Sequence, residues 1–259
     1  MWKEGSRRPT PAAFDGRIIH NQMILRFDPD DGDAESDEID RIAREHVDSI
    51  ADALAVQLAH IEVAASIGEI QRSMDTLPTQ PLRDALDALL RASAGRGVRM
   101  SATTLESVQA GVNWRLAHEM AMAWANSYSY ELVSYITSNS RQFIADALAG
   151  WVRDGGPMGD LVDRLAVRFG KTRAEMIAVT ESTRAYAEGS RLEFRNAGIR
   201  KVAVLTNRDD LVCEICWPHD GEIVDIDSGI PGLGFPPLHV RCRCYLAPVV
   251  ESGRPPAGV

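Results

Sequence analysis

The sequence predicts a mainly α-helical protein that ends in a small α+β module. Apolar residues recur at helical spacing over most of the chain up to residue 198. Beyond that point, Gly221–Ile226 alternates in the manner of a half-buried strand. All four cysteines also lie in this last part, at Cys213, Cys216, Cys242 and Cys244. We therefore expect a helical N-terminal region, then one further helix and short antiparallel strands stapled by a Cys/His cluster.

Length and charge limit the classes of function. A chain of 259 residues with 45% hydrophobic residues can bury a full core in one or two domains. The net charge of -9 argues against a protein that coats nucleic acid, because phosphate binding depends on Lys and Arg. We see no secretory signal and no apolar run of about 18 residues. We expect a protein made in the cytoplasm, without membrane contact, in which clustered cysteines are reduced and bind a metal.

Four segments are expected along the chain. Residues 1–35 form a flexible segment that includes most of an acidic run, with eight acidic residues and no basic one between Asp28 and Asp40. Residues 36–155 form the helical region, residues 156–250 form the module with the Cys/His cluster, and residues 251–259 form a flexible tail. We interpret the acidic run as a solvated linker that also places negative charge at a helix N-terminus.

Six helices are expected in the region up to residue 198, and capping residues set their limits. One amphipathic helix covers Ile39–Ile61, and a second begins at Pro81 and ends at Gly95. The pattern Thr103-x-x-Glu106 is typical of a capping box and predicts a third helix towards Ile136. The polar residues Asn139–Ser140 are expected to end this helix. A fourth helix covers Phe143–Trp151, and a fifth covers Leu161–Phe169. A second capping box at Thr172 begins the sixth helix, over Arg173–Asn196.

The Cys/His cluster is the main candidate site. Its spacing is C-x2-C at Cys213 and Cys216, followed after 22 residues by H-x2-C-x-C at His239, Cys242 and Cys244. Two such pairs from separate segments can complete a tetrahedron around a structural zinc ion. We expect Cys213, Cys216 and two of the other three residues to bind it, either His239 with Cys242 or Cys242 with Cys244. Two disulfides are the alternative. The closing strand after Cys244 contains Pro248, which predicts an edge or an end of the sheet.

The sixth predicted helix carries a second candidate, Glu181. A buried carboxylate could act as a general acid or base, but the sequence offers no second carboxylate or nucleophile beside it. We interpret Glu181 as a structural carboxylate that accepts hydrogen bonds from strand or loop amides. Gly189 in the same helix costs about 1 kcal/mol relative to alanine, which indicates close approach of another backbone.

Several motifs follow one another in the C-terminal part of the chain. They are Ala178-x-Thr180-Glu181, Ala185-x-x-x-Gly189, Thr206-x-x-Asp209-x-x-x-Cys213-x-x-Cys216, Gly221 and Pro237-x-His239-x-x-Cys242-Arg243-Cys244. Together they resemble the phage head morphogenesis family, the Mu F-like minor capsid proteins. The resemblance covers about residues 145–250, and Leu205 and Val240 depart from the usual Trp and Pro.

The resemblance implies a minor capsid protein of a tailed phage or prophage. It would act in head assembly, portal-vertex function or DNA packaging and delivery, and its partners would be the portal protein, a scaffold or capsid protein, and packaged DNA. It would be located in the virion head, and in the host cytoplasm during assembly. We expect it not to be an enzyme.

Two other classes of function remain open. One is a metal-dependent enzyme, a nuclease or transferase that uses Glu181, although five candidate ligands favour a closed site. The other is a zinc-ribbon protein that binds nucleic acid. Residues 164–201 contain nine Lys or Arg against four Glu, and the cations at its C-terminal end are Arg191, Arg195, Arg200 and Lys201.

Overall fold

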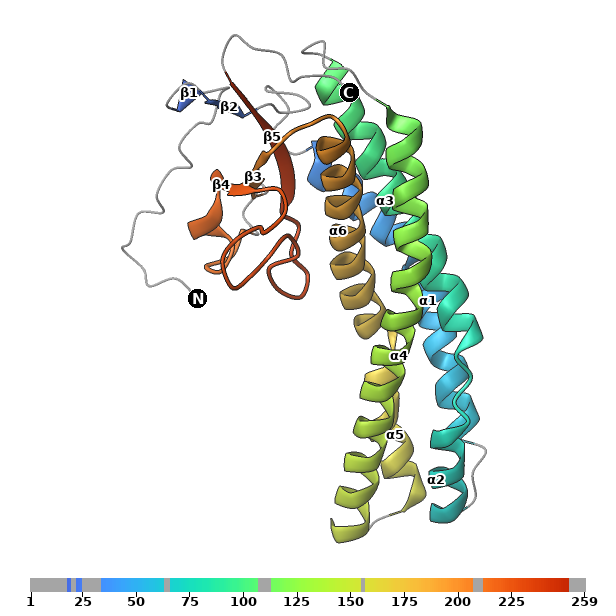
Figure 1. The fold of residues 1–259 in the computed structure, drawn as a ribbon. Helices are drawn as coiled ribbons and strands as arrows, with labels where there is room; N and C mark the ends of the chain where they lie inside the picture. Colours follow the sequence, from blue (N-terminus) through green and yellow to red (C-terminus); the bar gives the residue numbers. More distant parts are fainter. Residues whose placement is uncertain are drawn as a thin grey trace, which may run out of the picture.

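A computed structural model describes residues 18–19, 22–24, 34–62, 66–106, 113–154, 157–206 and 212–251. In these ranges a bundle of long helices lies beside a small antiparallel sheet (Figure 1). The predicted fold class is therefore confirmed. The flexible segments expected at residues 1–35 and 251–259 lie mostly outside the described residues.

The helices account for most of the described chain. They are α1 (Ala34–Glu62), α2 (Ile67–Asp75), α3 (Gln80–Glu106), α4 (Trp114–Asp154), α5 (Met158–Phe169) and α6 (Lys171–Asn196). The predicted first, fifth and sixth helices are confirmed, whereas α2 was not predicted. The predicted capping box at Thr172 is wrong, because Gly170 is the N-cap of α6 and provides no side chain. None of the described helices is both long and apolar enough to span a membrane.

The predicted end of the second helix at Gly95 is wrong, because α3 continues to Glu106. Glycines in this region allow two helices to pack closely where they cross, and they do not mark the end of a helix. A Cβ on Gly97 would collide with the carbonyl oxygen of Tyr186 in α6, and one on Gly189 would collide with the carbonyl oxygen of Ala94 in α3. The backbones of α3 and α6 thus touch, as the presence of Gly189 within a helix predicted.

Two other predicted boundaries are wrong for local reasons. Thr103 lies in the last turn of α3, where its hydroxyl donates to the Arg99 carbonyl instead of capping a new helix. The next described helix, α4, follows Asn113, whose side chain accepts the Leu116 N–H. No break occurs at residues 139–140, because α4 runs unbroken for 41 residues. The Ser140 hydroxyl bonds to the Ile136 carbonyl and accepts from Arg173, so this polar residue is satisfied inside the bundle.

The sheet contains five strands in the order β1-β2-β5-β3-β4, all antiparallel. The strands are β1 (Ile18–Ile19), β2 (Gln22–Ile24), β3 (Lys201–Leu205), β4 (Glu222–Asp225) and β5 (Tyr245–Glu251). The predicted strand after Gly221 is therefore confirmed as β4. The prediction that Pro248 restricts its strand to an edge or an end of the sheet is wrong, since β5 lies between β2 and β3. Only Val249–Glu251 of β5 pair with β2, so Pro248 lies just outside that pairing.

Helix α6 connects the two parts of the molecule. It packs against α1, α3 and α4 on one side and against β5 on the other. Between α6 and the sheet, a buried cluster contains Phe194, Val204 and Leu246 together with three of the cysteines. The candidate site is therefore built on the same core that joins the sheet to the bundle.

The buried carboxyl group of Glu193 should make the stability of the protein depend on pH. Glu193 in α6 is fully buried, and neither of its oxygens has a hydrogen-bond partner in the described part of the chain. Burial, with a smaller contribution from the Glu106 charge, raises the Glu193 pKa to about 7. The folded state therefore binds this proton more tightly than the unfolded state, and stability falls as pH rises from about 4.5 to about 7.

Glu193→Gln is expected to stabilise the protein by about 3 kcal/mol at pH 8 and to have little effect near pH 4.5, because the amide mimics the protonated acid. Urea unfolding at the two pH values measures the difference between variant and parent. The exposed Glu119→Gln serves as the control and should show no such pH dependence. An equal effect of Glu193→Gln at both values would contradict the prediction.

Candidate metal centre

The five predicted ligand residues lie close together at one end of the sheet, where β3 ends and β5 begins. Cys213 and Cys216 occupy a tight turn in which the Trp217 N–H donates to the Cys213 carbonyl over 2.9 Å. A short 3-10 helix, η1 (Trp217–His219), follows this turn. His239 and Cys242 lie in the loop that leads to β5, and Cys244 directly precedes that strand. The loop from His239 to Cys244 is called the ligand loop below.

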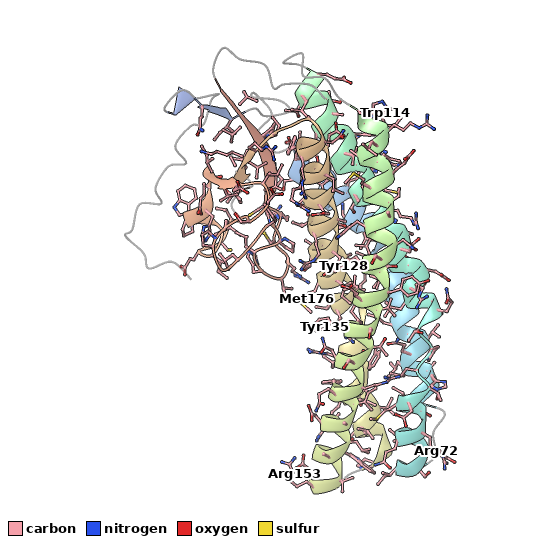
Figure 2. The ribbon with its side chains drawn as sticks, in the orientation of Figure 1. Arg72, Trp114, Tyr128, Tyr135, Arg153 and Met176 are labelled. Carbon is pink, nitrogen blue, oxygen red and sulfur yellow. The ribbon has the colours of Figure 1, made fainter. Side chains whose placement is uncertain are left out.

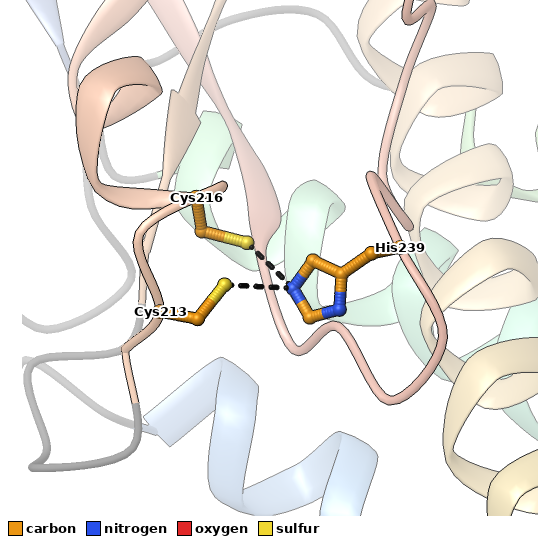
Figure 3. A group of neighbouring side chains, drawn as sticks. All are labelled: Cys213, Cys216 and His239. Carbon is orange, nitrogen blue, oxygen red and sulfur yellow. Dashed lines mark hydrogen bonds between the residues drawn. The ribbon is translucent and has the colours of Figure 1, made fainter. Parts of the chain in front are cut away.

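A first group consists of Cys213, Cys216 and His239 (Figure 3). The His239 Nε2 lies 3.1 Å from the Cys213 sulfur and 3.0 Å from the Cys216 sulfur. The other ring nitrogen, Nδ1, is 2.7 Å from the Val240 carbonyl oxygen, to which it must donate its hydrogen. This contact fixes the tautomer and turns the Nε2 lone pair toward the two sulfurs, as in histidine ligands of metal sites.

A second group consists of Cys216, Cys242 and Cys244. The sulfurs of Cys216 and Cys242 are 3.7 Å apart, and the Cys244 N–H donates to the Cys242 sulfur over 3.5 Å. These three side chains are buried, and all four cysteines are free thiols. Cys216 belongs to both groups, so it links the C-x2-C turn to the ligand loop.

Hydrogen bonds among the three buried thiols shift their pKa values in opposite directions. The hydrogen bond from the Cys216 thiol holds the pKa of Cys242 far below its usual range, and it raises the pKa of Cys216. Hydrogen bonds with Cys216 and Cys242, together with burial, also raise the pKa of Cys244. A thiolate at Cys242 is the form of cysteine that binds a cation.

The donor set fits a metal ion that prefers sulfur and nitrogen. In a tetrahedral zinc site two sulfur ligands lie about 3.8 Å apart, because each Zn–S bond is about 2.3 Å long. The separation of 3.7 Å between the Cys216 and Cys242 sulfurs agrees with this spacing. The cluster is thus able to hold a metal ion, and sequence spacing identified every member of it.

The anchors of the ligand loop were not identified from sequence. The Thr183 hydroxyl donates to the Cys242 carbonyl over 2.6 Å, and the Arg241 N–H donates to the Thr180 hydroxyl over 2.9 Å. Arg241 needs such support because it is the one described non-glycine residue with positive φ, at 63°. The three-residue spacing of these threonines on one helix face was the available signal. They fix the ligand loop to α6.

Glu181 faces away from the cluster, toward α4. Its Oε2 accepts hydrogen bonds from the Tyr128 hydroxyl at 3.1 Å and from the Arg184 Nε at 3.0 Å. The expectation that strand or loop amides bind it is therefore wrong, because the helix face that carries Glu181 packs on another helix. Burial raises the Glu181 pKa, while Arg184 and Tyr128 oppose that shift.

Glu181→Gln is expected to lower the thermal stability modestly, and Glu181→Ala is expected to lower it more. An unpaired buried donor costs about 1–3 kcal/mol, and alanine leaves the Tyr128 hydroxyl without its acceptor. Thermal unfolding of both variants, with the exposed Glu131→Gln as control, measures this order. A Glu181→Gln protein that folds normally but loses a measurable catalytic activity would instead support the enzyme class.

The region that contains the cluster matches a known protein family. Residues 142–247 match the family described as Phage Mu protein F like protein. The matched range starts within α4 and ends within β5, so it contains α5, α6 and the whole Cys/His cluster. The resemblance noted in the sequence is therefore confirmed for the C-terminal part of the chain. A search of the curated proteins found no match, and a search of the solved structures found none either.

Proposed function

From the match of residues 142–247 to the Phage Mu protein F like family, we propose that this chain is a minor head protein of a tailed phage or prophage. The match itself supports a role in phage head morphogenesis. The finer proposal is a non-enzymatic protein that acts at the portal vertex, in assembly of the head or in packaging and delivery of DNA. It would reside in the virion head and pass through the host cytoplasm during assembly.

A structural zinc ion would give the module a rigid end. The proposed ligands are Cys213, Cys216, His239 and Cys242, because Cys216 contacts both His239 and Cys242. Cys244 would support the site by donating its N–H to the Cys242 sulfur. When bound, such an ion would tie the turn at Cys213 to the ligand loop, and through Thr180 and Thr183 to α6.

The helical region would supply the surface that binds the portal protein, or a scaffold or capsid protein. Its longest helix, α4, has a single charged residue, Glu131, between Met120 and Ser140. Large apolar side chains are exposed along α4, among them Met120 at 42%, Tyr130 at 52% and Tyr135 at 66%. Figure 2 labels Tyr135 on this helix. Protein interfaces are depleted of charge and enriched in Tyr, Trp and Met, which favours the exposed part of α4 as the contact surface.

Co-purification with the portal protein from a two-gene expression tests the proposal. The parent chain is expected to associate with portal, and the double variant Met120→Glu, Tyr135→Glu is expected to lose the association. Val167→Glu provides the matched control, because Val167 in α5 is 79% exposed and lies on another helix. Failure of the parent to bind portal or procapsids, combined with turnover of DNA or nucleotide that depends on Glu181, would show that the class of function is wrong.

The enzyme class has less support. Glu181 contacts α4, while its neighbours Thr180 and Thr183 contact the ligand loop, so this carboxylate and the metal ligands lie on different sides of α6. The C-terminal cations of α6 also give limited support to a nucleic-acid binder. Arg191 pairs with Glu188 at 2.7 Å, and Arg195 pairs with Asp227 at 3.3 Å.

A further inference from the structure

A cavity of about 720 Å³ lies beside the metal cluster. Its walls come from three separate segments, namely α1, the N-terminal half of α6 and the ligand loop. His239, Arg241 and Arg243 line this cavity and also the small space around the cysteines. The cavity is therefore positioned by the same loop that carries the metal ligands.

Cationic side chains reach the cavity from each of its three walls. Arg44 comes from α1, Lys171 from the first turn of α6, and Arg241 and Arg243 from the ligand loop. Three carboxylates, Asp40, Asp48 and Glu175, also line it, so the lining has one more cation than anion. This excess is local, because the chain as a whole carries a net charge of -9.

The ion pairs inside the cavity leave cations available for a ligand. Lys171 lies 3.1 Å from Asp48 with both side chains more than half exposed, and Arg241 lies 3.4 Å from Glu175 with both partly exposed. Exposed pairs of this kind are held only weakly in water, so an anion can compete for Lys171 and Arg241. Arg243 lies 3.1 Å from Asp40 with both side chains mostly buried, so this third pair stays closed and the cations open to a ligand are Arg44, Lys171 and Arg241. Arg44 has no ion-pair or hydrogen-bond partner in the part of the chain that the structure describes.

We propose that this cavity binds a phosphate group, either free or within a nucleic-acid backbone. A tetrahedral oxyanion accepts hydrogen bonds from three directions at once, which matches cations that converge from α1, α6 and the ligand loop, whereas a carboxylate accepts in one plane. Lys171 is the first residue of α6, and the positive end of this helix adds to the attraction.

Binding of nucleic acid here would be independent of base sequence. None of the described residues that line the cavity is Phe, Tyr or Trp, so it lacks the large aromatic rings on which proteins usually stack bases. Contacts from Arg and Lys to backbone phosphates position a strand without reading its sequence. This inference rests on the proposed function and deepens it, because it gives packaged DNA a defined point of contact.

The double variant Arg44→Gln, Lys171→Gln tests the proposal without changing the ligand loop. Its matched control is Arg153→Gln, Arg164→Gln, which removes the same charge at the far end of the bundle, where Figure 2 labels Arg153. Zinc content and thermal unfolding establish that both proteins are folded. Binding of a short labelled duplex and of its single strand is followed by fluorescence anisotropy over a range of salt concentrations, and inorganic phosphate is titrated separately by calorimetry.

The cavity variant is expected to bind the labelled DNA at least about tenfold more weakly than the control. Its dependence of log K on log salt should also decrease by about 0.7–0.9 for each lost phosphate contact. If only inorganic phosphate binds, and the cavity variant abolishes it, free phosphate is the ligand. Equal binding by the cavity variant and the control overturns the proposal, as does preference for a poly-glutamate peptide over both phosphate probes. Portal association is measured separately, so a protein that binds portal but no phosphate contradicts this inference alone.

Discussion

Replacement of Cys216 by serine is expected to abolish zinc binding and to unfold the C-terminal module. Cys216 belongs to both ligand groups, with His239 at 3.0 Å and the Cys242 sulfur at 3.7 Å. Structural zinc contributes about 10–16 kcal/mol in isolated finger peptides, which is as large as the whole stability of a typical domain, about 5–15 kcal/mol. Metal analysis should give about one zinc per parent chain and none for the variant, and limited proteolysis should cut the variant within residues 212–251.

Cys244→Ser is the control for this experiment. Cys244 is as buried as Cys216, at 2% and 3% exposed, but it contributes its N–H rather than its sulfur to the proposed site. The variant should therefore keep its zinc at a modest cost in stability. Loss of zinc from Cys244→Ser would change the ligand set to include this residue. A parent protein without zinc, whose four thiols form two disulfides, would contradict the metal centre as a whole.

Gly189→Ala is expected to destabilise the bundle by more than about 3 kcal/mol, although alanine is the better helix former by about 1 kcal/mol. The added methyl would collide with the Ala94 carbonyl, and backbone atoms cannot move aside as a flexible side chain can. The two helices would have to separate, which would disturb the core around Tyr186 and Phe194.

Gly68→Ala in α2 provides the matched control, because a Cβ at that position meets nothing within 4 Å. This substitution should stabilise the protein by up to about 1 kcal/mol through helix propensity alone. Denaturant unfolding of the two variants gives the comparison directly. Similar stability of the two variants would contradict the inferred contact between the α3 and α6 backbones.

The sequence predicted those parts of the fold that depend on local patterns. The apolar stripe of α1, the end of α5 at Phe169 and the alternation of β4 follow from residues close together in the chain. The boundaries at Gly95 and Ser140 were wrong because their causes are distant in sequence. A Cβ on Gly95 would lie 3.3 Å from the His118 ring of α4, and a carbonyl of α6 requires a glycine at position 97 in the next half-turn. Arg173 donates to the Ser140 hydroxyl.

The candidate site shows the same division. The spacing of the Cys and His residues in the sequence identified all five members of the cluster, since C-x2-C and H-x2-C-x-C are local signatures. The threonine anchors on α6, the contact of Glu181 with Tyr128 and the cationic cavity were not predicted. Each of them joins segments more than 50 residues apart, such as Thr183 with Cys242 and Glu181 with Tyr128. Spacing along one segment carries no information about such pairs.

The central place of β5 affects how the chain can fold during synthesis. Of the described strands, β5 is made last, yet it is the one that joins β2 to β3. Until Tyr245–Glu251 has left the ribosome, the nascent chain exposes unpaired edges on both of these strands, and open edges invite pairing with other chains. A product stalled before Tyr245 would therefore be an aggregation hazard.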